Sequence, residues 1–137
     1  MLKWKIIYGC EGRGDGDSPY LTRWTLRSKE GGSADYVHYF HRSDHDEAHD
    51  HPWPFWTLVL WRGYREHIRL PDGTERVRRL WPGMIVYRPA NHAHWVELID
   101  GKPAVTFVHR GPYCREWGFF TAQGWQQWRE YFLERGC

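Results

Sequence analysis

Lysine, cysteine and long hydrophobic runs are all scarce in this sequence of 137 residues. The three cysteines, Cys10, Cys114 and Cys137, are widely spaced and include no Cys-x-x-Cys pair, which argues against a disulfide framework and against a thiolate zinc site. No apolar stretch approaches the length of a membrane span, and the apolar run near the N-terminus is too short for a signal peptide. We therefore expect a cytoplasmic protein that makes no membrane contact.

The excess of basic over acidic residues is small as well. Of the 19 basic residues only Lys3, Lys5, Lys29 and Lys102 are lysines, and the net charge is +2. A charge this small is not typical of nucleic-acid-binding proteins, and arginine in place of lysine favours planar partners such as carboxylates. We expect a small-molecule substrate and no nucleic acid, in a chain that is compatible with a homodimer.

What the sequence does contain is aromatic residues, with ten Trp, eight Tyr and six Phe, in short segments that have the composition or alternation of β-strands. Eight or nine strands are expected, at 4–8, 19–27, 35–41, 54–61, 64–70, 75–80, 84–88, 94–99 and 104–109. Apolar residues at helical spacing predict one amphipathic helix at about 123–135. We therefore predict an all-β fold, a single antiparallel β-barrel or jelly roll with a short C-terminal α-helix, as one domain over 1–137.

Two segments allow more than one interpretation. His38, His41, His45 and His49 are spaced three, four and four residues apart, which would align them on a helix. The β-forming residues at 36–40 favour a strand followed by a loop instead. Residues 9–17 are rich in glycine and aspartate, and we interpret them as an irregular, mobile loop.

Two His-x-His pairs carry the candidate chemistry. His49 and His51 are two residues apart, so in an extended chain both rings lie on one side, and Pro52 biases His51 towards that conformation. His92 and His94 form a second pair. Three or four imidazoles brought together by neighbouring strands would suit a borderline transition metal.

These segments resemble the two motifs of the cupin superfamily, whose fold is a small antiparallel β-barrel with a metal in its mouth. In the second motif Gly83, Pro89 and His94 match, while Asn91 and Leu98 stand in place of Gly and Asn. In the first motif His49, His51 and Gly63 match and Ser43 stands in place of Gly, so the motif core covers 43–98. The opening His-Asp-His-Pro-Trp and the later residues 115–119 are similar to a group of small single-domain cupins.

The glutamate of the first cupin motif is absent. With the four-residue spacing its position is occupied by Trp56, and no carboxylate lies from Pro52 to Tyr64. Three neutral imidazoles would leave a divalent metal its full double charge, which favours an anionic ligand.

The resemblance implies His49, His51 and His94 as metal ligands, with His92 as a fourth candidate. It implies one divalent transition metal per chain, with Fe(II) favoured and Zn, Ni or Mn also suitable, because cupins with three histidines and no acid include iron-dependent thiol and diketone dioxygenases. Residues expected in the substrate pocket are Trp53, Phe55, Trp56, Arg23, Arg88 and Trp95.

Three functions are compatible with these residues. The first is a dioxygenase-like oxidoreductase that uses Fe(II) to act on a small anionic or chelating molecule. The second is a non-redox isomerase or lyase in which the metal polarises a carbonyl. The third is a cupin that binds a metal or small molecule without catalysis, since a fold does not determine a function.

Overall fold

Antiparallel strands make up most of the computed structural model, which describes residues 3–10, 12 and 14–137. They are β1 (Lys3–Tyr8), β2 (Pro19–Ser28), β3 (Ala34–Phe40), β4 (Phe55–Trp61), β5 (Tyr64–Arg69), β6 (Glu75–Leu80), β7 (Ile85–Arg88), β8 (Ala93–Leu98), β9 (Ala104–Arg110), β10 (Gly118–Thr121) and β11 (Gly124–Gln127). A 3-10 turn, η2 (Ile99–Gly101), precedes β9, and one helix, α1 (Trp128–Glu134), follows β11.

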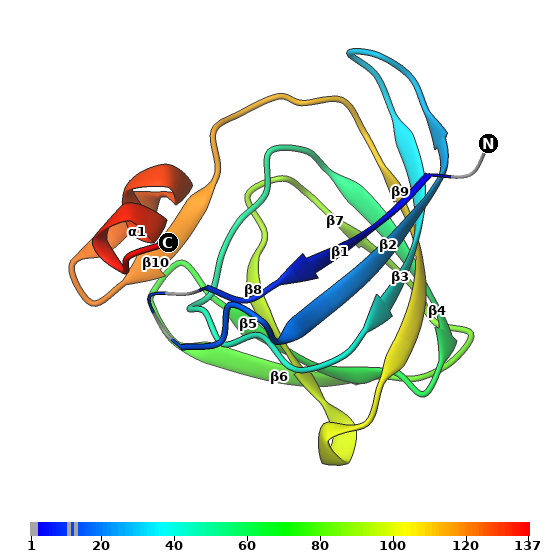
Figure 1. Cartoon of the computed structure of the whole chain (residues 1–137), viewed down its shortest axis with the longest axis horizontal. Helices are drawn as coiled ribbons and strands as arrows, with labels where there is room; N and C mark the ends of the chain where they lie inside the picture. Colours follow the sequence, from blue (N-terminus) through cyan, green and yellow to red (C-terminus); the bar gives the residue numbers. More distant parts are fainter. Residues whose placement is uncertain (1–2, 11, 13) are drawn as a thin grey trace.

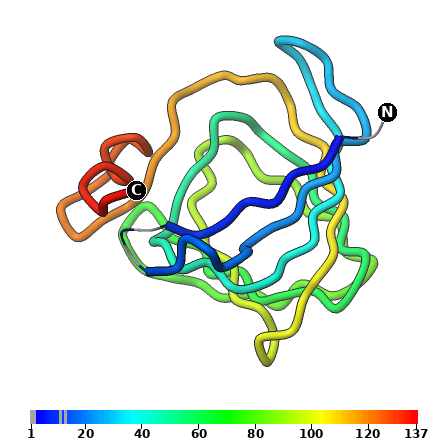
Figure 2. Tube along the Cα trace, viewed as in Figure 1, coloured from blue at the N-terminus to red at the C-terminus, as the bar shows by residue number. Residues whose placement is uncertain are grey.

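The strands form two facing sheets and a hairpin. Six strands pair in the order β1-β2-β3-β9-β4-β7, and three pair in the order β6-β5-β8. The two sheets curve around a common interior, and the β10-β11 hairpin and α1 lie together at one end of the barrel (Figure 1). The same winding of the chain around the interior is visible in the trace (Figure 2).

Alternation of side chains explains why these segments close into a barrel. In β3 every second residue is buried, so one face points inward and the other towards solvent. Inward-facing apolar residues from both sheets, among them Val59, Leu80 and Ala104, pack into one core cluster. The predicted all-β fold of antiparallel strands is therefore observed, and all nine predicted strands are present with ends within one residue of the prediction.

The C-terminal region differs from the prediction. The predicted helix at 123–135 is wrong in its first part, because 124–127 is the second strand of a hairpin and α1 begins only at Trp128. Gly124 has a φ of +109°, which suits a tight turn and not a helix. The Gln127 side chain accepts hydrogen bonds from the backbone N–H groups of Arg129 and Glu130, which fixes the start of the helix at that point.

The two chain ends are covalently joined, contrary to the prediction from cysteine spacing. Cys10 forms a disulfide with Cys137 across a separation of 127 residues, while Cys114 is a free, exposed thiol. The loop 9–17 is irregular as predicted, but Asp15 accepts a hydrogen bond from the Cys10 N–H at 2.7 Å and pairs with His45 at 2.8 Å. Glu11 and Arg13 of this loop lie outside the described residues.

In the described part of the chain, no helix combines the length and apolar character that crossing a membrane requires.

Candidate metal centre

Three imidazoles meet at one point inside the barrel. His49 and His51 precede β4, and His94 lies on β8. His49 and His94 exchange two backbone hydrogen bonds, each of 3.0 Å, which fixes the first segment against the strand. The candidate ligand atoms of His49, His51 and His94, which we call the histidine cluster, lie within 4.8 Å of one another.

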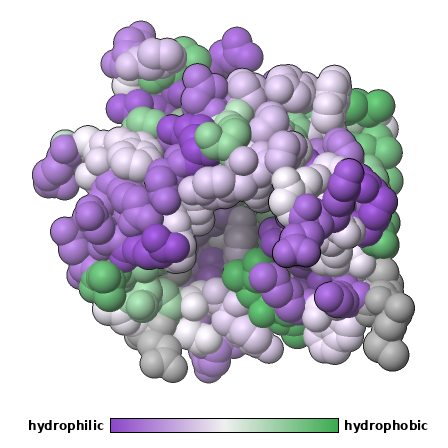
Figure 3. All heavy atoms as spheres, turned by 90° about the horizontal axis from the view of Figure 1, so that it is seen from above, coloured by the Kyte–Doolittle hydropathy of each residue, from purple (hydrophilic) through white to green (hydrophobic). Residues whose placement is uncertain are grey.

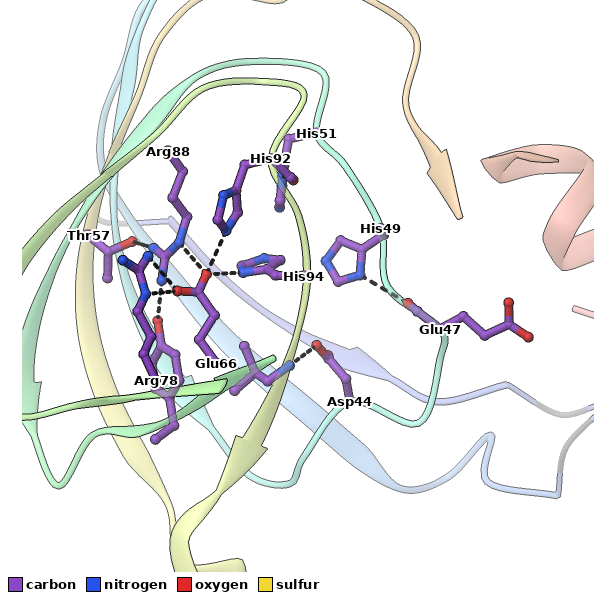
Figure 4. Close-up of polar contacts among 12 residues, drawn as sticks. Asp44, Glu47, His49, His51, Thr57, Glu66, Arg78, Arg88, His92 and His94 are labelled. Atoms are coloured by element: carbon purple, nitrogen blue, oxygen red, sulfur yellow. Dashed lines mark hydrogen bonds and ion pairs between the residues drawn. The ribbon is translucent and has the colours of Figure 1, made fainter. Parts of the chain in front are cut away.

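The hydrogen bonds of the three rings select which nitrogen faces the shared point. Nδ1 of His94 donates to Glu66 Oε2 at 2.5 Å, and Nδ1 of His51 donates to the His92 carbonyl at 3.2 Å. Nδ1 of His49 lies 3.5 Å from the Glu47 carbonyl. Each ring therefore keeps Nε2 as an unprotonated donor for a metal, an arrangement typical of metal-binding histidines (Figure 4).

The residue between the two histidines explains why both rings point the same way. Asp50 is 2% exposed and points in the opposite direction, where it accepts hydrogen bonds from the Gly118 N–H and Trp125 Nε1. Arg115 also pairs with Asp50, at 2.8 Å. This buried carboxylate therefore anchors the histidine segment to the C-terminal hairpin.

A buried glutamate that the sequence analysis did not identify lies directly behind His94. Glu66, on β5, has no exposed surface, and its Oε2 atom lies 2.7 Å from Arg88 Nε and 3.0 Å from His92 Nε2. Its other oxygen accepts from Arg78 at 2.6 Å. Figure 4 shows these side chains converging on the carboxylate from three directions. Glu66 follows the inward-facing Tyr64 by two residues, and this period of two was the signal for its position.

The charge state of the cluster follows from burial. Burial lowers the pKa of His94 to about 3, although the hydrogen bond to Glu66 opposes the shift. Burial, together with the neighbouring His94 and His49, also lowers the pKa of His51 well below its usual range. Burial alone would raise the pKa of Glu66, but the hydrogen bonds from His92 and His94 and the Arg88 cation lower it. Near neutral pH His51 and His94 are therefore neutral and lie beside an ionised glutamate, and neutral imidazole is the form that binds a metal.

His92 was predicted as a fourth candidate ligand, and the structure places it differently from the other three. Together with Glu66 and His94 it forms a second group whose ligand atoms lie within 4.8 Å of one another. In that group Glu66 is already held by the guanidinium groups of Arg78 and Arg88. Two neighbouring cations disfavour a metal there. His92 instead holds the ring of His51 through its backbone carbonyl and forms a hydrogen bond with Glu66 through Nε2.

The histidine cluster opens into a cavity of about 1020 Å³. Of the residues predicted for the substrate pocket, Arg23, Trp53, Phe55 and Arg88 line this cavity. A hollow bordered mainly by hydrophilic residues is visible on the face of the molecule in Figure 3. A volume of this size is at the upper end of the range for small-molecule sites.

Trp56 and Trp95 were predicted to line the substrate pocket, but neither of them lines the cavity. Trp56 is 49% exposed and packs on Tyr87, with ring centroids 4.9 Å apart. Trp95 stacks on His67 at 3.7 Å and donates to Glu75. Because strand residues alternate between faces, it is Phe55 that points inward, with its ring 4.5 Å from that of His51. The first cupin motif allows three or four residues between the second histidine and the glutamate. The three-residue spacing, which ends at Phe55, is the one that leads to an inward-facing position.

Comparisons with known proteins support the fold. No protein-family model and no curated protein sequence matches this chain. Among solved structures, it is similar to the DMSP lyase DddQ from Ruegeria pomeroyi DSS-3, with 21% identity and a TM-score of 0.64 over 90% of this chain and 63% of that one. The chain thus spans less than two thirds of that protein.

Two further structures extend the similarity. A cupin-2 domain protein from Rhodospirillum rubrum is 12% identical, with a TM-score of 0.67 over 90% of this chain and 78% of that one. The FeII form of HppE is 13% identical, with a TM-score of 0.60 over 79% of this chain and 56% of that one. At these identities the similarity establishes a cupin-like fold and no particular activity.

Proposed function

We propose that this protein is a mononuclear metal enzyme that binds one Fe(II) ion through the histidine cluster and oxidises a small anionic or chelating molecule with dioxygen. The observation that carries this proposal is the convergence of three Nε2 atoms, each on a ring held by its Nδ1 atom, at the wall of a cavity large enough for a substrate. The similarity in fold to FeII HppE supports iron as the first choice.

The donor set fits a divalent transition metal. Three imidazoles suit Fe, Zn, Ni or Mn, so the ligands alone do not favour one of these metals strongly. When bound, Fe(II) would supply redox chemistry and a point of attachment for substrate and dioxygen. No carboxylate belongs to the histidine cluster, and the charge of Glu66 is balanced by Arg78 and Arg88. The metal would therefore keep its double charge and favour an anionic substrate group.

The chain's own residues would orient the ligands and exclude water. Glu66 holds the ring of His94 through Nδ1, and the His92 carbonyl does the same for His51. Trp53 and Phe55 pack beside His51, with ring centroids 5.9 and 4.5 Å from it. These apolar rings lower the local dielectric, which strengthens the attraction between the metal and an anion.

A second candidate function is a non-redox lyase or isomerase. In that case the metal would act only as a Lewis acid on a carbonyl or carboxylate. The third candidate is a cupin that binds its ligand without turnover. The similarity in fold to a DMSP lyase favours the second candidate over the third.

Metal analysis and dioxygen uptake test the proposal. In untagged protein, His49→Ala, His51→Ala and His94→Ala should each reduce bound metal to near background, because two protein donors remain. The matched control His92→Ala should keep most of the metal. Dioxygen uptake that requires added Fe(II) would support the oxidase, whereas turnover with Zn or Mn under anaerobic conditions would support the lyase. Full metal occupancy in His94→Ala would contradict the ligand set.

A further inference from the structure

A row of polar residues crosses the inner face of the larger sheet, on strands that do not carry the histidine cluster. Arg23 on β2 pairs in register with His38 on β3, and His38 pairs in register with Thr106 on β9. All three line the same cavity as the histidine cluster. We call these three residues the polar row. Their neighbours along the strands, Leu21, Phe40 and Val108, are apolar and also line the cavity.

The arginine of this row has bonding capacity that the protein does not use. Its Nε donates to His38 Nε2 at 2.9 Å, and its guanidinium carbon lies 4.3 Å from the centre of the Tyr36 ring. Within the described part of the chain, its two terminal nitrogens have no hydrogen-bond partner and no carboxylate pairs with them. Burial and the nearby cation of Arg110 lower the pKa of Arg23, as expected of a cation without a counterion.

The other arginines at the cavity differ from Arg23. Arg88 is fully engaged, because its three nitrogens contact Glu66, Thr57 and the Tyr64 hydroxyl. Arg42 pairs with Asp15 at 3.4 Å and bonds Ser18. Arg129 lies exposed on α1, beside the ring of Trp128. Arg88, predicted as a pocket residue together with Arg23, therefore has a protein partner at each of its three nitrogens and Glu66 as its counterion.

The far end of the row provides a second, independent observation that points to a ligand. Thr106 is 1% exposed, and among the described residues its Oγ1 atom is one of two buried side-chain polar atoms without a hydrogen-bond partner. A buried hydroxyl without a partner costs free energy, and Thr106 is one of the residues that line the cavity. A ligand oxygen at the polar row would satisfy it once the side chain turns its hydroxyl towards the cavity.

We propose that Arg23, assisted by the Thr106 hydroxyl, binds a carboxylate of the substrate, whose other end lies at the histidine cluster. This inference rests on the proposed function and narrows its substrate to acids that carry a second metal-binding group, such as dicarboxylic, hydroxy or oxo acids. Two parallel terminal N–H groups match a carboxylate. Within the polar row Arg23 is the one cation, and His38 beside it is neutral, which suits the single negative charge of a carboxylate.

Calorimetric binding of a dicarboxylate series tests the assignment. The probes are malonate, succinate, glutarate and adipate with their monoamides, added to metal-free protein and to Zn(II)-loaded protein, in which no oxidation occurs. The best diacid should bind wild type at least 10-fold more tightly than its monoamide. Equal binding of diacid and monoamide throughout the series would overturn the proposal, as would tighter binding of inorganic phosphate than of any diacid.

Variants locate the carboxylate. Arg23→Gln should weaken binding of the best diacid about 10- to 100-fold, the range expected for hydrogen bonds to a charged group. Arg23→Lys keeps the charge but not the paired donors and should lose less, and Thr106→Val should lose a few-fold. Arg129→Gln is the matched control, because it removes an exposed cavity arginine, and should bind as wild type does.

The design separates failure of this inference from failure of the proposed function. If the histidine cluster binds no metal, Zn(II) content shows it, and the dependence on Arg23 is still measured in the metal-free protein. Unchanged diacid affinity in Arg23→Gln with normal Zn(II) content and circular dichroism would overturn the inference alone. Should Arg23→Gln fail to fold, Arg23→Lys replaces it in the test. The inference would be rejected if Arg23→Lys bound the diacid as tightly as wild type does and showed no preference for the diacid over the monoamide.

Discussion

At the scale of single residues, Glu66 is the side chain on which most polar contacts of the candidate centre converge. It accepts from His94, His92, Arg88 and Arg78 and has no exposed surface. Removing its charge would leave the buried Arg88 without a counterion, and the His94 ring would lose the acceptor that holds it.

Glu66→Gln should therefore destabilise the protein by about 3–5 kcal/mol, the usual cost of breaking a buried ion pair. Metal affinity should fall by about 10- to 100-fold, because a residue that orients a ligand ring has changed. Urea denaturation and a metal titration measure the two effects. Glu97→Gln is the control, since Glu97 pairs with His67 at a side chain that is 40% exposed. Equal effects in both variants would argue against this role for Glu66.

Phe55 and Trp56 are adjacent but lie on opposite faces of β4, which provides a matched pair for the missing cupin glutamate. Phe55→Glu would place a carboxylate beside His51, whereas Trp56→Glu changes only an exposed position. We expect Phe55→Glu to lower the melting temperature of the metal-free protein and to increase the rise that Zn(II) produces. Trp56→Glu should alter neither. If the rise in melting temperature with Zn(II) changed only in Trp56→Glu, position 56 and not position 55 would correspond to the cupin glutamate.

His38 should make stability depend on pH. Burial, and to a smaller extent the charge of Arg23, lowers the pKa of His38 well below its usual value near 6.5. The unfolded chain therefore binds more protons than the folded one below about pH 6.5, so the free energy of unfolding falls as the pH is lowered. One such group accounts for at most about 1.4 kcal/mol per pH unit. Urea denaturation at pH 7 and pH 5 measures how far the free energy of unfolding falls between the two pH values. This decrease should be smaller in His38→Gln than in wild type. The control His45→Gln, at an exposed loop position, should not make the decrease smaller.

At the scale of elements, strands were predictable because burial on one face imposes a period of two that is visible in the sequence. The alternating burial of β3 is an example. The hairpin of β10 and β11 was not predicted, because its second strand, Gly-Trp-Gln-Gln, also fits the start of an amphipathic helix. Contact with Asp50 and the turn at Gly124 decide between the two, and neither is visible in local sequence.

The candidate centre was predictable to the same extent. His49, His51 and His94 were implied by the resemblance to the cupin motifs, and the structure brings them together. The partners behind them were not, because Glu66 reaches His94 only through the pairing of β5 with β8, in which Ile68 and not Glu66 lies opposite His94. Strand parity also placed Trp56 on the outside, which the four-residue motif spacing had concealed.

At the scale of the whole molecule, the disulfide between Cys10 and Cys137 links the loop after β1 to the end of α1. Cys10, Phe132 and Cys137 all line the cavity, so the bond lies at its wall. Disulfides persist in oxidising compartments and are rare in the cytosol, so the state of this bond in the native cell is a test of the cytoplasmic location expected from the sequence. Mass spectrometry of protein from native cells, alkylated before reduction, would decide whether the bond forms there.

The disulfide should contribute measurably to stability, because it closes most of the chain into one loop and so restricts the unfolded state. We expect Cys137→Ser to lower the free energy of unfolding by about 2–4 kcal/mol, a typical effect of removing a disulfide. Guanidinium denaturation with and without dithiothreitol measures this, and the reductant should destabilise wild type but not the variant. Cys114→Ser, at the exposed free thiol, is the control. Equal stability of wild type and Cys137→Ser under oxidising conditions would show that the bond does not form in solution.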